Sequence, residues 1–125
     1  MTIAQGLDDL RANHPGCRLA AFGDLGTRLI LRTSTDETHP QEFLDLICAQ
    51  AAQNFSLSDK VRPADADPET AGREVVVMTS RDVRVIVRST DNPSDFVCCI
   101  CETGTSVEDV AVDAAAVLHK LAVGS

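Results

Sequence analysis

The spacing of apolar residues along this chain changes between helical and strand periods. Residues 2–13 place apolar side chains at helical spacing with charged residues between them, which predicts an amphipathic helix. Two short apolar runs follow, at 18–22 and 28–32. The segment 23–27 between them contains two glycines and an aspartate, a composition that favours a β-hairpin.

A second helix is predicted from Pro40 to Phe55. Proline suits the first turn of a helix because its missing N–H would have no partner there. The apolar face of this helix comprises Phe43, Leu44, Ile47, Cys48 and Ala51. Residues 56–73 are polar and contain two prolines, with no large apolar residue after Val61. We expect this segment to be an exposed loop.

The second half of the chain is rich in predicted strands. Residues 74–79 are mostly apolar, whereas 83–88 alternate between valines on one face and Arg-Ile-Arg on the other. Residues 96–101 are apolar on both faces, which is typical of a central strand that is covered on both sides. Residues 105–108 read T-x-x-E, a capping box that predicts the start of a last helix.

These elements predict one α+β domain over residues 1–125. The fold class is a single antiparallel five-stranded sheet flanked by helices, in the order α-β-β-α-β-β-β-α. A chain of this length is sufficient to bury a core without disulfides or metal ions.

The strand Glu74–Thr79 is unusual because it has neither proline nor lysine to protect it. The polar segment before it separates it from the preceding helix. At the edge of a sheet, it would offer unpaired N–H and C=O groups to a second chain. The sequence therefore predicts a dimerising interaction module.

Composition and charge narrow the possible partners. The net charge is −8 and the pI is 4.6, and the chain has no tryptophan or tyrosine. Nucleic acid is not expected as a partner, because phosphates would be repelled and aromatic stacking platforms are scarce. Anionic membranes are disfavoured for the same electrostatic reason. No apolar run reaches the roughly 18 residues of a membrane helix, and no signal peptide is recognisable, so we expect a cytoplasmic protein.

The chain has five cysteines, three of which lie in the predicted strand at 96–101. Cys99 and Cys101 should share one face of this strand, with Cys98 on the other. We interpret them as reduced core residues and expect no metal or other cofactor. A zinc site would need two more ligands, one of which Cys17 could supply if its strand lies alongside.

Sequence motifs for catalysis are missing, since the chain contains no G-x-S-x-G, no P-loop and no G-x-G-x-x-G. A non-enzymatic role is therefore expected. Two Arg-x-Ile-x-Arg triplets supply candidate partner-binding residues, namely Arg28, Arg32, Arg84 and Arg88. If both triplets face the same way, they form a basic, half-apolar surface for an acidic partner. The alternative is that their stems cover apolar surface while the charges remain in water.

This pattern resembles the roadblock/LC7 family, whose topology is similar to that of profilin and longin domains. The matching features are residues 20–26 with an Asp-x-Gly hairpin, the helix at 40–55, and the strands and closing helix at 74–121. The resemblance implies a non-enzymatic homodimer or heterodimer. It also implies a scaffold or regulator of small Ras-like GTPases, or a light chain of a motor complex.

Members of this family pair through the middle helix and the strand that follows it. Carried over to this chain, the resemblance predicts a homodimer interface formed by Phe43, Leu44, Ile47, Val75, Val76, Val77 and Met78.

An alternative class is the small, acidic, dimeric chaperones of type III secretion, which bind an effector protein. They also combine three helices with five strands, but they place three strands before the middle helix and two after it. The present chain is predicted to have two before and three after. The number of strands between residues 15 and 40 distinguishes the two possibilities.

Overall fold

The computed structural model describes residues 2–61 and 74–124. Its elements are α1 (Ile3–Asn13), β1 (Cys17–Asp24), β2 (Leu29–Thr35), α2 (Gln41–Val61), β3 (Glu74–Met78), β4 (Asp82–Arg88), β5 (Asp95–Glu102) and α3 (Val107–Gly124). The predicted fold class and element order are confirmed. Two of the described strands precede α2 and three follow it, so the order expected for secretion chaperones is not the one observed.

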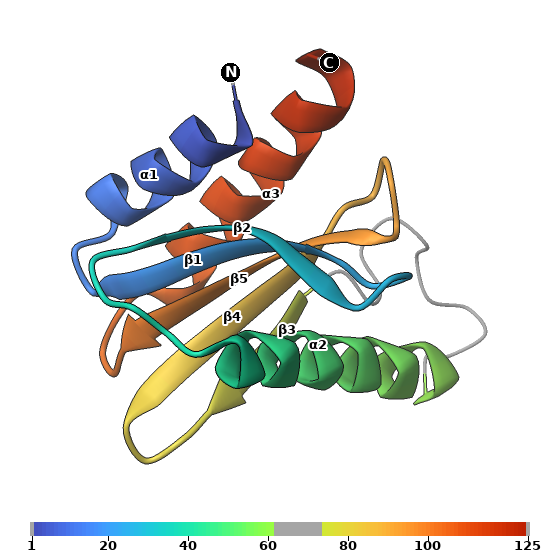
Figure 1. Ribbon diagram of the computed structural model, residues 1–125, viewed down its shortest axis with the longest axis horizontal. Helices are drawn as coiled ribbons and strands as arrows, with labels where there is room; N and C mark the ends of the chain where they lie inside the picture. Colours follow the sequence, from blue (N-terminus) through green and yellow to red (C-terminus); the bar gives the residue numbers. More distant parts are fainter. Residues whose placement is uncertain (1, 62–73, 125) are drawn as a thin grey trace.

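The five strands form one antiparallel sheet in the order β2-β1-β5-β4-β3. Helices α1 and α3 lie on one face of this sheet, and α2 lies on the other (Figure 1). Strand β5 occupies the centre, as its apolar sequence predicted, and β3 lies at an edge. The central position follows from sequence, because a strand that is apolar on both faces must be covered on both.

Strand β5 separates two hydrophobic cores. The core beneath α1 and α3 contains three residues of β5 and three of β4, namely Val97, Cys99, Cys101, Val83, Val85 and Val87. The core beneath α2 contains Phe96, Cys98, Ile100 and Ile86. The predicted alternation of β4 is therefore confirmed, with its valines toward α3 and Ile86 toward α2.

Arg84 of β4 projects toward α2 rather than into solvent. Its guanidinium carbon lies 5.8 Å from the centre of the Phe43 ring, and Nη1 donates a hydrogen bond of 3.0 Å to Oε1 of Gln50. The side chain is only 15% exposed. The helix therefore covers this arginine.

Arg88, two residues further along β4, is held in the same way near the end of α2. Its guanidinium carbon lies 4.7 Å from the centre of the Phe55 ring, and Nη2 lies 2.8 Å from Oδ1 of Asp59. The side chain is 17% exposed. The sequence offered two interpretations of these arginines, a basic surface for an acidic partner or charges in water above apolar stems, and neither predicted this arrangement. The two arginines are neither a free basic patch nor solvated cover, but cations packed between sheet and helix.

The other arginine triplet is interrupted by a β-bulge. The register of β1 against β2 shifts between Phe22 and Gly23, so that Ile30 lies opposite Gly23 whereas Arg32 lies opposite Phe22. Ile30 consequently packs into the core beneath α2, and Arg32 stands on the opposite face of the sheet. Arg28 precedes the strand in a turn, with a positive φ of 58°. The two triplets therefore do not share a common face, which is the condition that a joint basic surface required.

Two helix boundaries differ from those predicted. Helix α2 continues to Val61, so residues 56–61 are helical rather than loop, and the remainder of the predicted loop, 62–73, lies outside the described residues. Helix α3 begins at Val107, two residues after the predicted cap. The Thr105 hydroxyl donates to the carbonyl of Glu102 at 2.7 Å instead of forming the predicted capping box. None of the helices in the described part of the chain is long and apolar enough to cross a membrane.

The packing of Arg88 predicts a stability effect of charge reversal. Arg88→Glu would place a carboxylate beside Asp59 and against the Phe55 ring, and we expect it to lower the free energy of unfolding by about 2 kcal/mol. Urea denaturation followed by circular dichroism measures this loss. Arg81→Glu, in the exposed turn before β4, is the matched control and should change stability by no more than about 0.5 kcal/mol. Equal effects of the two substitutions would contradict the packing role of Arg88.

Candidate protein–protein interface

Strand β3, which pairs only with β4 among the described strands, presents backbone hydrogen-bonding groups along its free edge, called the open edge below. The N–H of Thr79 donates to the carbonyl of Asp82 at 2.9 Å, which closes the hairpin between β3 and β4. Antiparallel ladders alternate between bonded and non-bonded pairs, so Val76 and Met78 occupy non-bonded pairs with β4. Their N–H and C=O groups consequently point away from β4, toward the open edge of the sheet.

The side chains on this edge are apolar and accessible. Val76 is 42% exposed and Met78 is 75% exposed, and by register both stand on the face of the sheet that carries α3. Val77 is half-buried on the α2 face, opposite Arg84. Val75 belongs to the strand, but its side chain lies outside the described part of the structure. Three of the predicted interface positions thus have described side chains on the edge strand.

The exposed apolar residues of helix α2 differ from those that the sequence assigned to an interface. Ile47 is fully buried in the core beneath the helix and is not on the surface of this chain. Phe43 and Leu44 are half-buried and pack against the same core. Leu46, by contrast, is 59% exposed. It lies one turn before Gln50, which reaches Arg84 of β4, so Leu46 is on the side of α2 turned toward β4 and β3.

Sequence reasoning missed the exposed apolar residues of the helices. Leu46 and Leu57, both in α2, are 59% and 52% exposed, and Val112 of α3 is 66% exposed. The signal that could have identified them is their displacement from the core stripe of each helix. Leu46 and Leu57 are eleven residues apart, or about three turns, and therefore share one line along the surface of α2.

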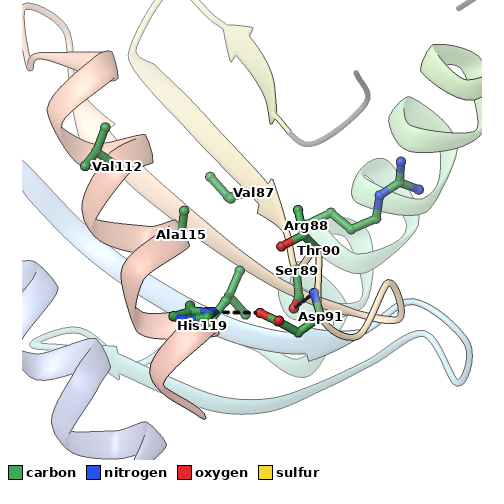
Figure 2. A pocket seen from close by; sticks show the side chains of 9 residues that line it. Val87, Arg88, Ser89, Thr90, Asp91, Val112, Ala115 and His119 are labelled. Carbon is green, nitrogen blue, oxygen red and sulfur yellow. Dashed lines mark hydrogen bonds and ion pairs between the residues drawn. The ribbon is translucent and has the colours of Figure 1, made fainter. Parts of the chain in front are cut away.

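A small pocket lies beside the α3 side of this edge (Figure 2). It has a volume of about 230 Å³, an apolar wall that includes Val87, Val112 and Leu118, and a polar rim. On the rim, Nδ1 of His119 lies 3.1 Å from Oδ2 of Asp91. Val87 pairs directly with Glu74 of β3, so the pocket adjoins the edge strand. Its size and lining suit an apolar side chain of a partner.

The opposite edge of the sheet is chemically different. Strand β2 also exposes apolar side chains, with Leu29 at 49% and Leu31 at 55%. However, Arg28 and Arg32 flank these residues and are themselves exposed. Charged side chains on an edge strand oppose pairing with another chain. Strands β1 and β5 separate these two arginines from Arg84 and Arg88, so the four candidate arginines do not form one surface.

The cysteines are all buried and free. Cys99 and Cys101 share the core beneath α1 and α3 with Cys17, whereas Cys98 lies in the core beneath α2, which confirms the predicted faces. Across residues 2–61 and 74–124, no group of three histidine, cysteine or acidic side chains has an arrangement that could hold a metal ion.

No protein-family model matches the chain, and no curated protein matches it in sequence. In structure it is similar to a roadblock/LC7 domain from Streptomyces avermitilis, with a TM-score of 0.73 and 16% identity, over 94% of this chain and 92% of that one. MglB from Myxococcus xanthus gives a TM-score of 0.73 at 11% identity, over 96% and 91%. LokiProfilin2, in its complex with rabbit actin, gives 0.61 at 12% identity, over 98% of each chain.

These likenesses extend over nearly the whole length of the chain. At identities between 11% and 16%, such a likeness establishes architecture. The chain therefore has the roadblock/LC7 fold, as its sequence pattern suggested.

Proposed function

We propose that this protein is a non-enzymatic, homodimeric scaffold that regulates a protein partner, with a small Ras-like GTPase as the partner class. The observation that carries the proposal is the open edge of β3. This strand combines outward backbone donors and acceptors with exposed apolar side chains, and Val75–Met78 contain no charge.

Pairing of two β3 strands about a two-fold axis would continue the sheet from one copy into the other. A stable interface buries about 800 Å² on each partner, which is more than a five-residue strand can supply alone. The exposed Leu46 on the α2 side and Val112 on the α3 side lie on the two faces that flank the strand. They provide the additional apolar area that such a dimer needs.

Structural neighbours support self-association and a regulatory role. One of them is described as MglB with a tetrameric arrangement, with a TM-score of 0.73 and 14% identity. The roadblock/LC7 fold itself favours a GTPase as the partner, because of the regulatory role associated with that family. The neighbours carry this inference by analogy of fold, and the contacts of β3 carry the inference of a dimer independently.

Two histidines contact aspartate carboxylates in the structure. Nε2 of His14 lies 2.6 Å from Oδ2 of Asp113, and His119 pairs with Asp91. The first of these pairs connects the end of α1 to α3 and therefore has a structural function. The proposed activity depends on presenting a surface, and it needs no cofactor.

A proline at Val76 tests the role of the edge backbone. Because the Val76 N–H points away from β4, Val76→Pro should remove a donor to the second copy while preserving the β3–β4 hairpin. We expect a monomer with an unchanged circular dichroism spectrum, measured by light scattering coupled to size exclusion. Val76→Thr keeps the N–H and should remain dimeric. A monomeric wild-type protein, or a dimeric proline variant, would overturn pairing through β3.

A charge at Met78 tests the apolar side chains. Met78→Glu would bring two carboxylates into a small apolar interface, and we expect the dimer dissociation constant to rise at least about tenfold. Sedimentation equilibrium measures that constant. Leu31→Glu changes a similarly exposed residue on the opposite sheet edge, so its dissociation constant should match that of the wild type. If Leu31→Glu separates the dimer instead, the interface lies at β2.

The partner class is tested with Ras-like GTPases from the source organism, each loaded with GDP or a non-hydrolysable GTP analogue. We expect one of them to bind with a preference for one nucleotide state, and the complex to contain two copies of this protein. Calorimetric titration gives the affinity and the stoichiometry. The protein alone should not hydrolyse GTP. The proposal would be contradicted if the isolated protein hydrolysed GTP, or if it bound none of the GTPases in either nucleotide state.

A further inference from the structure

Three of the five thiols gather in one place between β1 and β5. Cys17, Cys99 and Cys101 belong to the core beneath α1 and α3, whereas Cys48 and Cys98 lie in the core beneath α2. This division provides a test group of cysteines and a matched control group within the same chain.

The register of β1 against β5 places Cys17 directly opposite Cys101. The register shifts between Cys17 and Leu19, which leaves Arg18 out of the ladder with its side chain 52% exposed. Without this irregularity, regular alternation would turn Arg18 toward the core and Cys17 away from Cys101. The cost of burying the Arg18 charge therefore favours the arrangement that brings the two thiols together.

The backbone geometry at this pair is compatible with a disulfide. The N–H of Glu102 donates to the carbonyl of Gly16 at 2.9 Å, on the adjacent pair of residues. Cys17 and Cys101 therefore form a non-hydrogen-bonded pair, for which the Cα–Cα separation is about 4.5 Å. That separation lies within the range observed for disulfides, about 4.4–6.8 Å.

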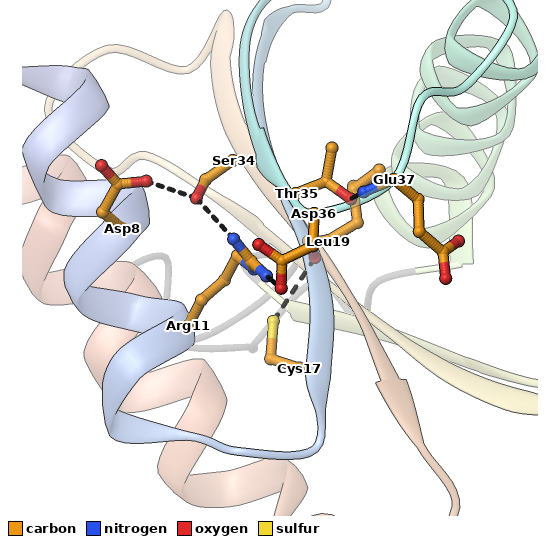
Figure 3. A network of polar contacts seen from close by, with 8 residues as sticks. All are labelled: Asp8, Arg11, Cys17, Leu19, Ser34, Thr35, Asp36 and Glu37. Atoms are coloured by element: carbon orange, nitrogen blue, oxygen red, sulfur yellow. Dashed lines mark hydrogen bonds and ion pairs between the residues drawn. The ribbon is translucent and has the colours of Figure 1, made fainter.

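The surroundings favour the thiolate of Cys17. Hydrogen bonds from the Cys101 and Cys99 thiols lower the pKa of Cys17 below its ordinary value, and the nearby Arg11 and His14 act in the same direction, while burial opposes them. Arg11 is held in place by Ser34 and Asp36, and Figure 3 shows it above the Cys17 sulfur.

The control cysteines have the opposite tendency. Burial raises the pKa of Cys98 to about 12, and burial together with the nearby Asp45 raises the pKa of Cys48. At neutral pH their thiols remain protonated and unreactive. Hydrogen bonds to Cys17, together with burial, likewise raise the pKa values of Cys99 and Cys101, so Cys17 should be the reactive thiol and Cys101 its resolving partner.

A small oxidant can approach the pair from the end of the sheet. Cys17 is 5% exposed, and an open pocket of about 370 Å³ adjoins it. Residues on both sides of the pair line this pocket, with Pro15 and Gly16 before Cys17 and Glu102 and Thr103 after Cys101. Hydrogen peroxide is small enough to reach the sulfur through a modest local opening.

We propose that Cys17 and Cys101 are a redox modification site, at which a hydroperoxide forms a reversible cross-strand disulfide. The Cys17 thiolate attacks one peroxide oxygen, breaks the O–O bond and becomes a sulfenic acid, and hydroxide leaves and is protonated to water. The Cys101 sulfur then attacks the Cys17 sulfur, and a second water leaves with the Cys101 proton. The two thiols lose two electrons and two protons in total, and peroxide is reduced to two molecules of water.

The experiment exposes the reduced, folded protein to hydrogen peroxide, blocks the remaining thiols with N-ethylmaleimide and maps tryptic peptides by mass spectrometry. Trypsin separates Cys17, in the peptide 12–18, from Cys48, in 33–60. Cys98, Cys99 and Cys101 share the peptide 89–120, so fragmentation of the linked peptides identifies the partner. We expect the loss of two blocked thiols, a link from Cys17 to Cys101, and recovery of both thiols in dithiothreitol.

Serine variants provide the controls. Cys48→Ser, Cys98→Ser and Cys99→Ser should form the link as the wild type does, whereas Cys101→Ser should instead accumulate a dimedone-reactive sulfenic acid at Cys17. The wild-type peptide map is informative even if a variant folds poorly. A link from Cys17 to Cys99, oxidation without any link, or a bridge that involves Cys48 or Cys98 would overturn the proposal.

Discussion

The apolar character of β5 on both faces is the constraint on which the rest of the structure depends. A strand of this kind is stable only when apolar layers cover it from both sides, because each exposed face would otherwise leave several large side chains in water. One layer is supplied by α1 and α3, and the other by α2. With β5 at the centre and β1 and β4 beside it, β2 and β3 become the two edges.

In the described part of the chain a single helix, α2, lies on this face of the five-stranded sheet, and two arginines of β4 pack against it. Arg84 and Arg88 extend their apolar stems along the sheet and place their guanidinium groups over the phenylalanine rings of the helix. Each guanidinium also has a polar partner on α2, the Gln50 amide for Arg84 and the Asp59 carboxylate for Arg88, and Arg84 lies 3.6 Å from the Asp82 carboxylate. Strand β4 therefore pairs with β3 and also holds α2 against the sheet.

The sequence was sufficient to predict the fold, because hydrophobic periodicity reports directly on which faces are buried. It placed β5 at the centre, gave β4 its two faces and left β3 as an unprotected strand. The bulge between β1 and β2 was not predicted, because Gly23, which lies at the register shift, was assigned to the hairpin turn at 23–27. The covering of Arg84 by α2 is a tertiary contact, which strand alternation cannot reveal.

The edge position of β3 was predictable, but the exposed residues of α2 beside it were not. The edge strand was recognised from its own composition. On α2, Ile47 was assigned both to the core stripe and to the interface, and in the structure it lies in the core. The residue beside it, Leu46, is the exposed one. A single leucine outside the apolar stripe of a helix does not stand out in the sequence, whereas the structure shows that Leu46 is the apolar side chain on the surface.

The position of β3 also has a consequence for the distribution of stability within the molecule. Among the described strands it contacts one neighbour, and two of its side chains contribute little to either core. Its local opening therefore requires less free energy than global unfolding, and its amide hydrogens should exchange with solvent through subglobal fluctuations. A chain that pairs with this edge would suppress those fluctuations, so that binding and ordering of β3 become a single thermodynamic event.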